Sequence, residues 1–294
     1  MSGKDFFIRR YERLGWRYRK TTPRQAIRIN TMNCNEEEIV SRLKSKGTEL
    51  EKIPFVKNGY WVSKAAFSLG ATTEYLLGYY SIQEAASQIP AMLFTDPQDK
   101  TVLDACAAPG GKTVQLADLM LNSGSITALD VKKQRLRALS NHLERCHAKN
   151  VIVYQEDARR ISRFKIMYDR VLLDLPCSGN FVTDKEWFSR RTIQDIERNA
   201  SLQKEILAEA VKILKEDGEI VYSTCSLEPE ENEINIDWAT RKLSLKVVEI
   251  NCYGEQALTE VFGRPLSSQL KSCRRIWPGS TQGFFVCKLK RDNR

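Results

Sequence analysis

From residue 101 onward the chain alternates between short apolar runs and longer amphipathic stretches. Five runs have the length and composition of buried strands: 101–105, 125–130, 151–154, 170–174 and 219–222. Between them, three stretches repeat apolar side chains at helical spacing: 112–121, 132–147 and 202–214. Two later runs, 245–250 and 283–289, are predicted as the last strands. Strands that alternate with helices are typical of a parallel sheet covered on both faces, so we predict an α/β domain.

The first part of the chain follows a different pattern. Residues 26–30 and 60–62 alternate as short strands, and residues 36–46 have helical spacing. A length of 294 residues suits about two domains. We therefore expect a small α+β domain over residues 1–80 and a larger domain over residues 81–294, although no linker marks the boundary.

Positive charge is concentrated at the N-terminus. Residues 1–30 contain nine Lys or Arg and two acids, which is most of the net charge of +9, and aromatic residues lie between the charges. Basic groups neutralise phosphates and rings stack on bases, so a polynucleotide partner is one interpretation. An ordinary solvated helix whose aromatic rings pack on the core is the other, and both stay open. We expect Arg9, Arg10 and Arg13 to contact phosphates. Arg274 and Arg275, near the C-terminus, are two further candidates.

Several classes of protein are disfavoured by composition. No apolar run approaches the roughly 18 residues that a membrane-spanning helix needs, and residues 1–16 lack the apolar centre of a secretory signal. The eight cysteines are scattered without a CxxC pair, and there are two histidines. We therefore expect neither a disulfide framework nor a metal site, but a cytoplasmic enzyme with free thiols that does not bind membranes.

The loop after the first predicted strand of the larger domain has the composition of a ligand-binding loop. Small residues and two glycines follow Asp104, which lets the backbone approach a ligand at a helix N-terminus. A phosphate-binding P-loop would need glycine where Cys106 stands, and the dinucleotide GxGxxG pattern is also absent. A nucleoside-binding loop remains, with Asp130 placed to accept hydrogen bonds from ribose and Asp157 near the base. The alternative for both acids is a helix N-cap.

Two thiols follow the fourth and fifth predicted strands of this domain, at Cys177 and Cys225. A lone cysteine is usually a small buried hydrophobe, but these two share the edge of the sheet where ligands bind, with Asp174 close by in sequence. This set suits chemistry on a pyrimidine. Addition of a thiolate at C6 makes C5 of cytosine nucleophilic toward a methyl donor, while an acid protonates N3.

Several segments together resemble the RNA cytosine-5 methyltransferases of the Nop/Sun type (RsmB/Nop). They occur in this order: YSIQEAAS at 80–87, CAAPGGKT at 106–113, DLPCSG at 174–179, STCS at 223–226 with PEENE at 229–233, and RIWP at 275–278 with GFF at 283–285. The resemblance extends from about residue 25 to the C-terminus. It implies a Rossmann-like methyltransferase domain that uses S-adenosylmethionine, preceded by a small domain like an RNA-recognition motif.

The resemblance also implies roles for individual residues. Cys225 would be the nucleophile that attacks C6, and Cys177 would assist product release. Asp174 and Lys112 would line the reacting base, with Asp174 at N3. DNA cytosine-5 methyltransferases instead use the cysteine of the PC motif as nucleophile, so the opposite assignment stays open. The implied cofactor site comprises Cys106, Ala107, Ala108, Pro109, Gly110, Gly111, Lys112, Asp130, Arg135, Asp157 and Asp174.

The length of the chain is similar to that of the short, archaeal, tRNA-modifying members of this family. We therefore expect methylation of cytosine C5 in RNA, with tRNA as the first candidate substrate. Ribosomal RNA, DNA and a non-catalytic RNA-binding assembly role are the alternatives. The sequence does not reveal whether a partner protein is needed.

Overall fold

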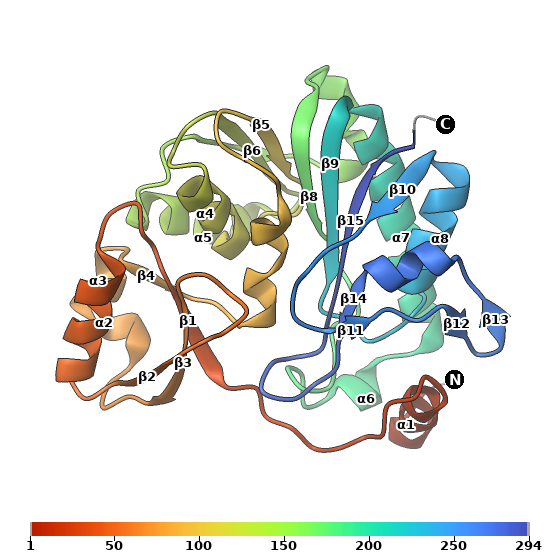
Figure 1. Cartoon of the computed structure of the whole chain (residues 1–294), viewed down its shortest axis with the longest axis horizontal. Coiled ribbons are helices and arrows are strands. Elements are labelled where there is room, and N and C mark those ends of the chain that lie inside the picture. Colours follow the sequence, from red (N-terminus) through yellow and green to blue (C-terminus); the bar gives the residue numbers. More distant parts are fainter. Residues whose placement is uncertain (1, 293–294) are drawn as a thin grey trace.

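A large mixed sheet and a small antiparallel sheet lie next to each other in the protein (Figure 1). A computed structural model describes residues 2–292. Met1 and residues 293–294, which begin and end the two expected domains, lie outside the described residues. The expected boundary at residue 80 coincides with the first residue of β4 (Tyr80–Ile82).

The five predicted strands of the larger domain form a parallel sheet in the order β7-β6-β5-β8-β9. Their bounds are β5 (Thr101–Asp104), β6 (Ser125–Asp130), β7 (Val151–Gln155), β8 (Tyr168–Asp174) and β9 (Leu214–Thr224). Consecutive residues of a strand point to opposite faces of a sheet. Leu172 accordingly packs in one apolar cluster, whereas Val171 and Leu173 pack in another. Both faces are therefore buried, as the continuous apolar runs predict.

The predicted parallel strands form only part of the sheet, which is mixed. Beyond β9 it continues with antiparallel pairs that involve four later strands: β10 (Leu245–Val248), β11 (Glu255–Gln256), β14 (Arg274–Ile276) and β15 (Phe284–Arg291). The segment between β14 and β15 covers residues 277–283 only. A parallel crossover takes a dozen or more residues, so a connection of this length produces an antiparallel pair. A separate short hairpin joins β12 (Glu260–Val261) and β13 (Arg264–Pro265).

Helices connect these strands close to the predicted positions. They are α4 (Gly111–Leu119), α5 (Lys133–Arg145), α6 (Trp187–Arg190), α7 (Ile193–Lys212) and α8 (Glu233–Lys242), with the shorter η4 (Ala158–Phe164) and η5 (Ser268–Ser272). Helix α7 begins well before residue 202, where the apolar spacing predicted it. Thr192 and Asp195 form a capping box, in which each side chain accepts a hydrogen bond from the backbone N–H of the other residue.

The small domain has the element order β1-α2-β2-β3-α3-β4 and the strand order β2-β3-β1-β4, all antiparallel. Its bounds are β1 (Gln25–Ile29), α2 (Glu36–Ser45), β2 (Glu49–Lys52), β3 (Gly59–Lys64), η1 (Leu69–Ala71), α3 (Thr73–Leu76) and β4, followed by η2 (Ala86–Gln88) and η3 (Pro90–Leu93). This is the split βαβ arrangement with a four-stranded sheet. The α+β fold expected for the N-terminal domain is confirmed.

The basic N-terminal segment packs on the larger domain. Helix α1 (Lys4–Arg13) lies beside α6, and residues 14–24 run below the molecule to β1 (Figure 1). Phe7 and Tyr11 are fully buried, and the ring of Phe7 meets that of Trp187 at 4.6 Å. These rings therefore pack on the core, which was the alternative to stacking on bases.

Two arginines expected to contact phosphate are engaged inside the protein, so these expectations are wrong. Arg10 pairs with Glu228 at 3.0 Å and with Glu230 at 2.8 Å. Arg275 is 1% exposed, pairs with Glu233, and donates to the Leu227 carbonyl oxygen at 2.8 Å. Buried charges require such partners, which turns both side chains away from solvent. Arg9 and Arg13 are exposed.

Replacing Arg275 with leucine is expected to lower the free energy of unfolding by about 3–5 kcal/mol, because it leaves the fully buried carboxylate of Glu233 without its partner. Urea denaturation of the purified protein measures this change. Arg198 is 78% exposed and lies 3.8 Å from Asp195, so Arg198→Leu should change the free energy by less than about 1 kcal/mol. Equal effects of the two variants would contradict the prediction.

Candidate active site

The polar residues of the candidate site gather at one edge of the large sheet. β5, β6 and β8 end at Asp104, Asp130 and Asp174. Because these strands are parallel, their carboxyl ends share an edge, and loops after them form the ligand-binding side of such folds. In the register of β8 and β9, Asp174 lies opposite Ser223, which brings the loop of Cys177 next to that of Cys225.

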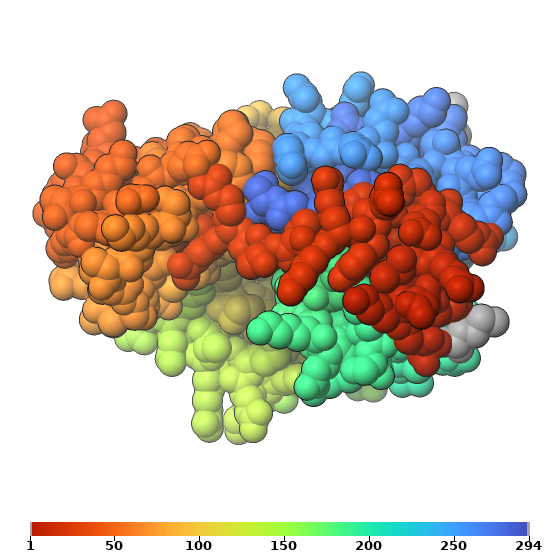
Figure 2. All heavy atoms as spheres, turned by 90° about the horizontal axis from the view of Figure 1, so that it is seen from below, coloured from red at the N-terminus to blue at the C-terminus, as the bar shows by residue number. Residues whose placement is uncertain are grey.

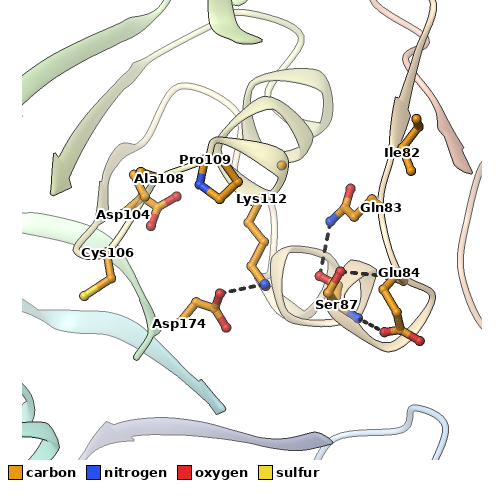
Figure 3. Close-up of a pocket in the computed structure, with 12 residues that line it drawn as sticks. Ile82, Gln83, Glu84, Ser87, Asp104, Cys106, Ala108, Pro109, Lys112 and Asp174 are labelled. Atoms are coloured by element: carbon orange, nitrogen blue, oxygen red, sulfur yellow. Dashed lines mark hydrogen bonds and ion pairs between the residues drawn. The ribbon is translucent and has the colours of Figure 1, made fainter. Parts of the chain in front are cut away.

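A pocket lies where the loop after β5 leads into α4 (Figure 3). Its lining includes Cys106, Ala107, Ala108, Pro109, Gly111 and Lys112 from this loop, together with Asp104 and Asp174. Gly110 precedes α4 with a φ of 105°, and a Cβ there would lie 2.9 Å from Leu139. Glycine is therefore required for the turn that brings this backbone beside the pocket.

A second hollow continues on the other side of Cys106, which lines both. It is bordered by Asp130, Asp157 and Arg135, with apolar side chains such as Leu202 and Ile206. The sequence-predicted acids therefore face one cavity.

Both acids also make local hydrogen bonds, but only Asp157 is a helix N-cap, as the alternative interpretation predicted for both. Asp157 is the N-cap of η4 and pairs with Arg159 at 2.6 Å. Asp130 accepts from the Lys132 N–H at 2.9 Å and pairs with Arg135 at 3.0 Å. Arg135 in turn donates to the Ala108 carbonyl oxygen, so it braces the loop against β6. Capping and cavity lining are thus combined in Asp157, whereas Asp130 lines the cavity without capping α5, whose N-cap position is Lys132.

Asp104 lines the first pocket and has no role in the sequence-based prediction. Its side chain is 1% exposed, and Thr113 donates to Oδ2 at 2.7 Å. Burial raises the pKa of Asp104 to about 7, although the Thr113 hydrogen bond opposes this shift. Among the described residues, Oδ1 has no hydrogen-bond partner. A buried carboxyl oxygen without a partner in a pocket is suited to a polar or cationic ligand group.

Three more lining residues come from the segment after β4: Gln83, Glu84 and Ser87. Figure 3 shows them facing the pocket wall that contains Lys112. Ser87 N–H donates to Glu84 at 3.2 Å, and burial raises the pKa of Glu84. The segment YSIQEAAS is indicated by the resemblance alone, and nothing in its pattern predicts that it faces the loop after β5.

Lys112 and Asp174 join the pocket to the thiol loops. Lys112 Nζ lies 2.7 Å from Asp174 Oδ2 (Figure 3). Ser223 Oγ donates to Oδ1 of the same carboxylate at 2.8 Å. The Asp174 side chain is 30% exposed, so a ligand can reach it. An acid and an ammonium group at this distance can hold and exchange a proton with a bound base.

The two candidate thiols are in contact, with 3.3 Å between Cys177 Sγ and Cys225 Sγ. Asn180 fixes the loop of Cys177 by donating to the Cys225 carbonyl oxygen at 2.7 Å. On the other side, Ser178 donates from N and Oγ to the buried Glu231, at 2.9 and 2.7 Å. The hydrogen-bonded sulfur pair is therefore held in place from both loops.

The two sulfurs are not equivalent. The hydrogen bond with Cys225 raises the pKa of the Cys177 thiol well above its usual range, and burial and the charge of Glu231 add to this. Either sulfur can be the donor in this contact.

Helix α1 supports the loop that follows Cys225. Tyr11 OH donates to Glu228 Oε1 at 2.8 Å, and Arg10 pairs with the other oxygen of this carboxylate. Burial raises the pKa of Glu228 to about 7. Because Glu228 is three residues beyond Cys225, the N-terminal segment contributes to the position of this thiol.

Comparison with known proteins agrees with this architecture. The family model described as 16S rRNA methyltransferase RsmB/F matches residues 91–290, and the model for the N-terminal domain of 16S rRNA methyltransferase RsmF matches residues 5–85. The chain belongs to this family. The resemblance to the RsmB/Nop type and the Rossmann-like fold are thereby confirmed.

Individual relatives in this family differ in length. A tRNA (cytosine(49)-C(5))-methyltransferase of Pyrococcus abyssi is 34% identical over 97% of this chain and 95% of its own. A 28S rRNA (cytosine-C(5))-methyltransferase of Mus musculus is 35% identical over 90% of this chain, which spans 35% of the mouse protein. The crystal structure of a methyltransferase homologue from Pyrococcus horikoshii superposes with a TM-score of 0.85 at 38% identity, covering 96% of this chain and 90% of that one.

Two negative findings concern residues 2–292. No group of three or more His, Cys, Asp or Glu side chains in this range is arranged to hold a metal ion. None of its helices is long and apolar enough to cross a membrane.

Proposed function

We propose that this protein methylates C5 of cytosine in RNA. The observation that supports this most directly is the pair of sulfurs 3.3 Å apart on neighbouring loops, beside the Lys112–Asp174 pair. Nucleophilic addition to a pyrimidine needs a thiolate and a proton donor that both reach the same bound base. The cysteine pair and the Lys112–Asp174 pair can supply these two groups. The relatives named above carry RNA cytosine-C5 methylation in their names.

The residues present fit S-adenosylmethionine. The unpartnered Oδ1 of Asp104 suits a cationic amino group, and the glycine turn at Gly110 leaves backbone room beside it. The hollow with Asp130 and Asp157 offers acceptors for ribose and base, next to apolar Leu202 and Ile206. When bound, this cofactor supplies a methyl group activated by a positively charged sulfur.

In the proposed mechanism, Cys225 forms a bond from its sulfur to C6 of cytosine. The proton held between Lys112 and Asp174 moves to N3, so that the electron pair of the opened double bond reaches C5 and C5 can accept the methyl group. Solvent water then takes the C5 proton, and the electrons of the C5–H bond restore the C5–C6 double bond. The C6–S bond breaks with its electron pair returning to Cys225, and N3 returns its proton to the Lys112–Asp174 pair. Cys177, in contact with Cys225, assists this last stage.

We propose tRNA as the substrate, because the Pyrococcus abyssi relative that matches nearly end to end is named as a tRNA enzyme. Ribosomal RNA is the second candidate, on the strength of the mouse relative and the family description.

The test is to incubate the protein with labelled S-adenosylmethionine and unmodified tRNA, ribosomal RNA and matched DNA, and then to map 5-methylcytosine by bisulfite sequencing. Methylcytosine in tRNA alone supports the proposal, and modification of ribosomal RNA alone would replace tRNA by the second candidate. Transfer to DNA alone, or to none of the polymers, would overturn the proposed function.

Replacing Asp130 with asparagine is expected to weaken cofactor binding about ten- to a hundredfold, because hydrogen bonds to a charged group contribute about 1.5–3 kcal/mol each. Isothermal titration with S-adenosylhomocysteine measures this affinity without any reaction. Asp217 is exposed near the start of β9, so Asp217→Asn should bind normally. Unchanged binding by Asp130→Asn would show that Asp130 acts only through Lys132 and Arg135.

A further inference from the structure

A third hollow, of about 630 Å³, lies away from the cofactor pocket, between the N-terminal segment and the loop before α6. The residues of one wall are Lys4, Tyr18, Lys20, Thr21 and Thr22, and those of the other are Phe181, Val182, Lys185, Phe188 and Ser189. Figure 2 shows this face, with the red N-terminal segment lying across the molecule next to the green atoms of the second wall. We refer to it as the strap groove.

The strap groove is positively charged. Lys20 and Lys185 are exposed on its two walls, and Lys4 lies at one end with its ammonium 5.4 Å from the ring of Tyr18. Within residues 2–292, none of these three ammonium groups forms an ion pair with a carboxylate. Lysines that lack acidic partners attract a polyanion and release its counterions on binding.

Aromatic rings line the same hollow. Phe181 and Phe188 are stacked at 4.9 Å with their planes 14° apart, and Tyr18 lies 5.4 Å from Phe181. All three side chains are partly exposed, unlike Phe7 and Tyr11 behind them. A row of ring surfaces inside a basic groove is the combination that binds single-stranded nucleic acid without reading its sequence.

The groove is tied to the thiol loops by a short connection. Phe181 follows Cys177 by four residues, which span at most about 14 Å. Asn180 links the strap groove to the loop of Cys225 directly. Its side-chain amide N–H donates to the Cys225 carbonyl oxygen at 2.7 Å, and its Oδ1 accepts from the N–H of Val182, which lines the groove, at 3.0 Å. A strand whose base reaches Cys225 would therefore have its neighbouring nucleotides within reach of the strap groove.

We propose that the strap groove binds the unpaired nucleotides that flank the target cytosine, with lysines on their phosphates and the Tyr18, Phe181 and Phe188 rings against their bases. This inference rests on the proposed function. A cytosine that is modified within a folded RNA must leave its stack, and its neighbours then need a surface of their own. The groove would hold that locally unpaired strand.

The test compares RNA affinity over a range of salt concentrations for the wild type and Lys20→Gln/Lys185→Gln, using an RNA transcript and fluorescence anisotropy. Loss of two phosphate contacts should lower the slope of log Kd against log salt by about 1.4, at about 0.7 per contact for single strands. Lys149→Gln/Lys242→Gln is the matched control. Both lysines are exposed, and they precede the first residues of β7 and β10, whereas the thiol loops follow the last residues of β8 and β9. The control should leave the slope unchanged.

Phe188→Leu keeps an apolar side chain but removes a ring, so it should weaken RNA binding about five- to a hundredfold without changing the salt slope. S-adenosylhomocysteine binding monitors folding and should be unaffected in every variant. An unchanged slope for the lysine variant overturns the inference, as does equal competition by polyglutamate, which would indicate a protein partner. If RNA binds through the groove but no RNA is methylated, the proposed function fails, and the groove is left as an RNA-binding surface without a target cytosine.

Discussion

Replacing Cys225 with alanine is expected to lower the rate of methyl transfer to RNA by several orders of magnitude, because loss of a covalent nucleophile removes the reaction path itself. Without a sulfur bonded to C6, C5 of cytosine stays a poor nucleophile. Single-turnover transfer from labelled S-adenosylmethionine, with enzyme in excess over RNA, isolates the chemical step from binding and release.

Cys252→Ala is the matched control for this variant. Cys252 is also a partly buried free thiol, but it lies in a hollow with Trp277 and Pro278 away from the cofactor pocket. It should retain wild-type transfer, and both variants should bind S-adenosylhomocysteine normally. Full activity of Cys225→Ala would remove this residue as the nucleophile. If Cys177→Ala were then the inactive variant, the assignment found in DNA cytosine enzymes would apply.

Much of the fold could be predicted from local pattern. The runs at 101–105 and 170–174 form β5 and β8 because their residues are apolar on both faces of the sheet. The antiparallel direction of β15 could not be predicted, since a strand has the same apolar pattern whichever way it pairs. The start of α7 was missed because its first turns are polar, although Thr192 and Asp195 carry a recognisable cap.

The candidate site was predictable only where chemistry and spacing coincide. The glycine turn, Lys112 and the two thiols lie in motifs that indicate their proximity to strand ends. Asp104 and Glu84 were missed as candidate site residues, because their significance depends on burial and on a segment that folds over from the small domain.

Predictions of charge failed for a related reason. Arg10 and Arg275 look like solvent-facing cations in the sequence, yet each pairs with a buried glutamate that follows Cys225 in the chain. Which basic residue meets which acid is decided by tertiary packing and not by local composition. These ion pairs link α1 and β14 to the segment after Cys225. Arg10 and Arg275 therefore help to hold that segment in place and do not face solvent.

Replacing Cys177 with alanine is expected to produce a stable covalent complex between protein and RNA. Addition of Cys225 to C6 and methylation at C5 can still proceed. The elimination that breaks the C6–S bond, however, loses the sulfur that lies 3.3 Å from Cys225 Sγ. The complex should appear as a slower band on a denaturing gel that contains both labelled RNA and protein, whereas the wild type should show little of it.

The double variant Cys177→Ala/Cys225→Ala separates this interpretation from nonspecific crosslinking, because it lacks the sulfur that would hold the RNA. It should give no slow band under the same conditions, and adding nuclease should shift the band of the single variant to nearly the size of the free protein. A band from Cys225→Ala and none from Cys177→Ala would reverse the two roles.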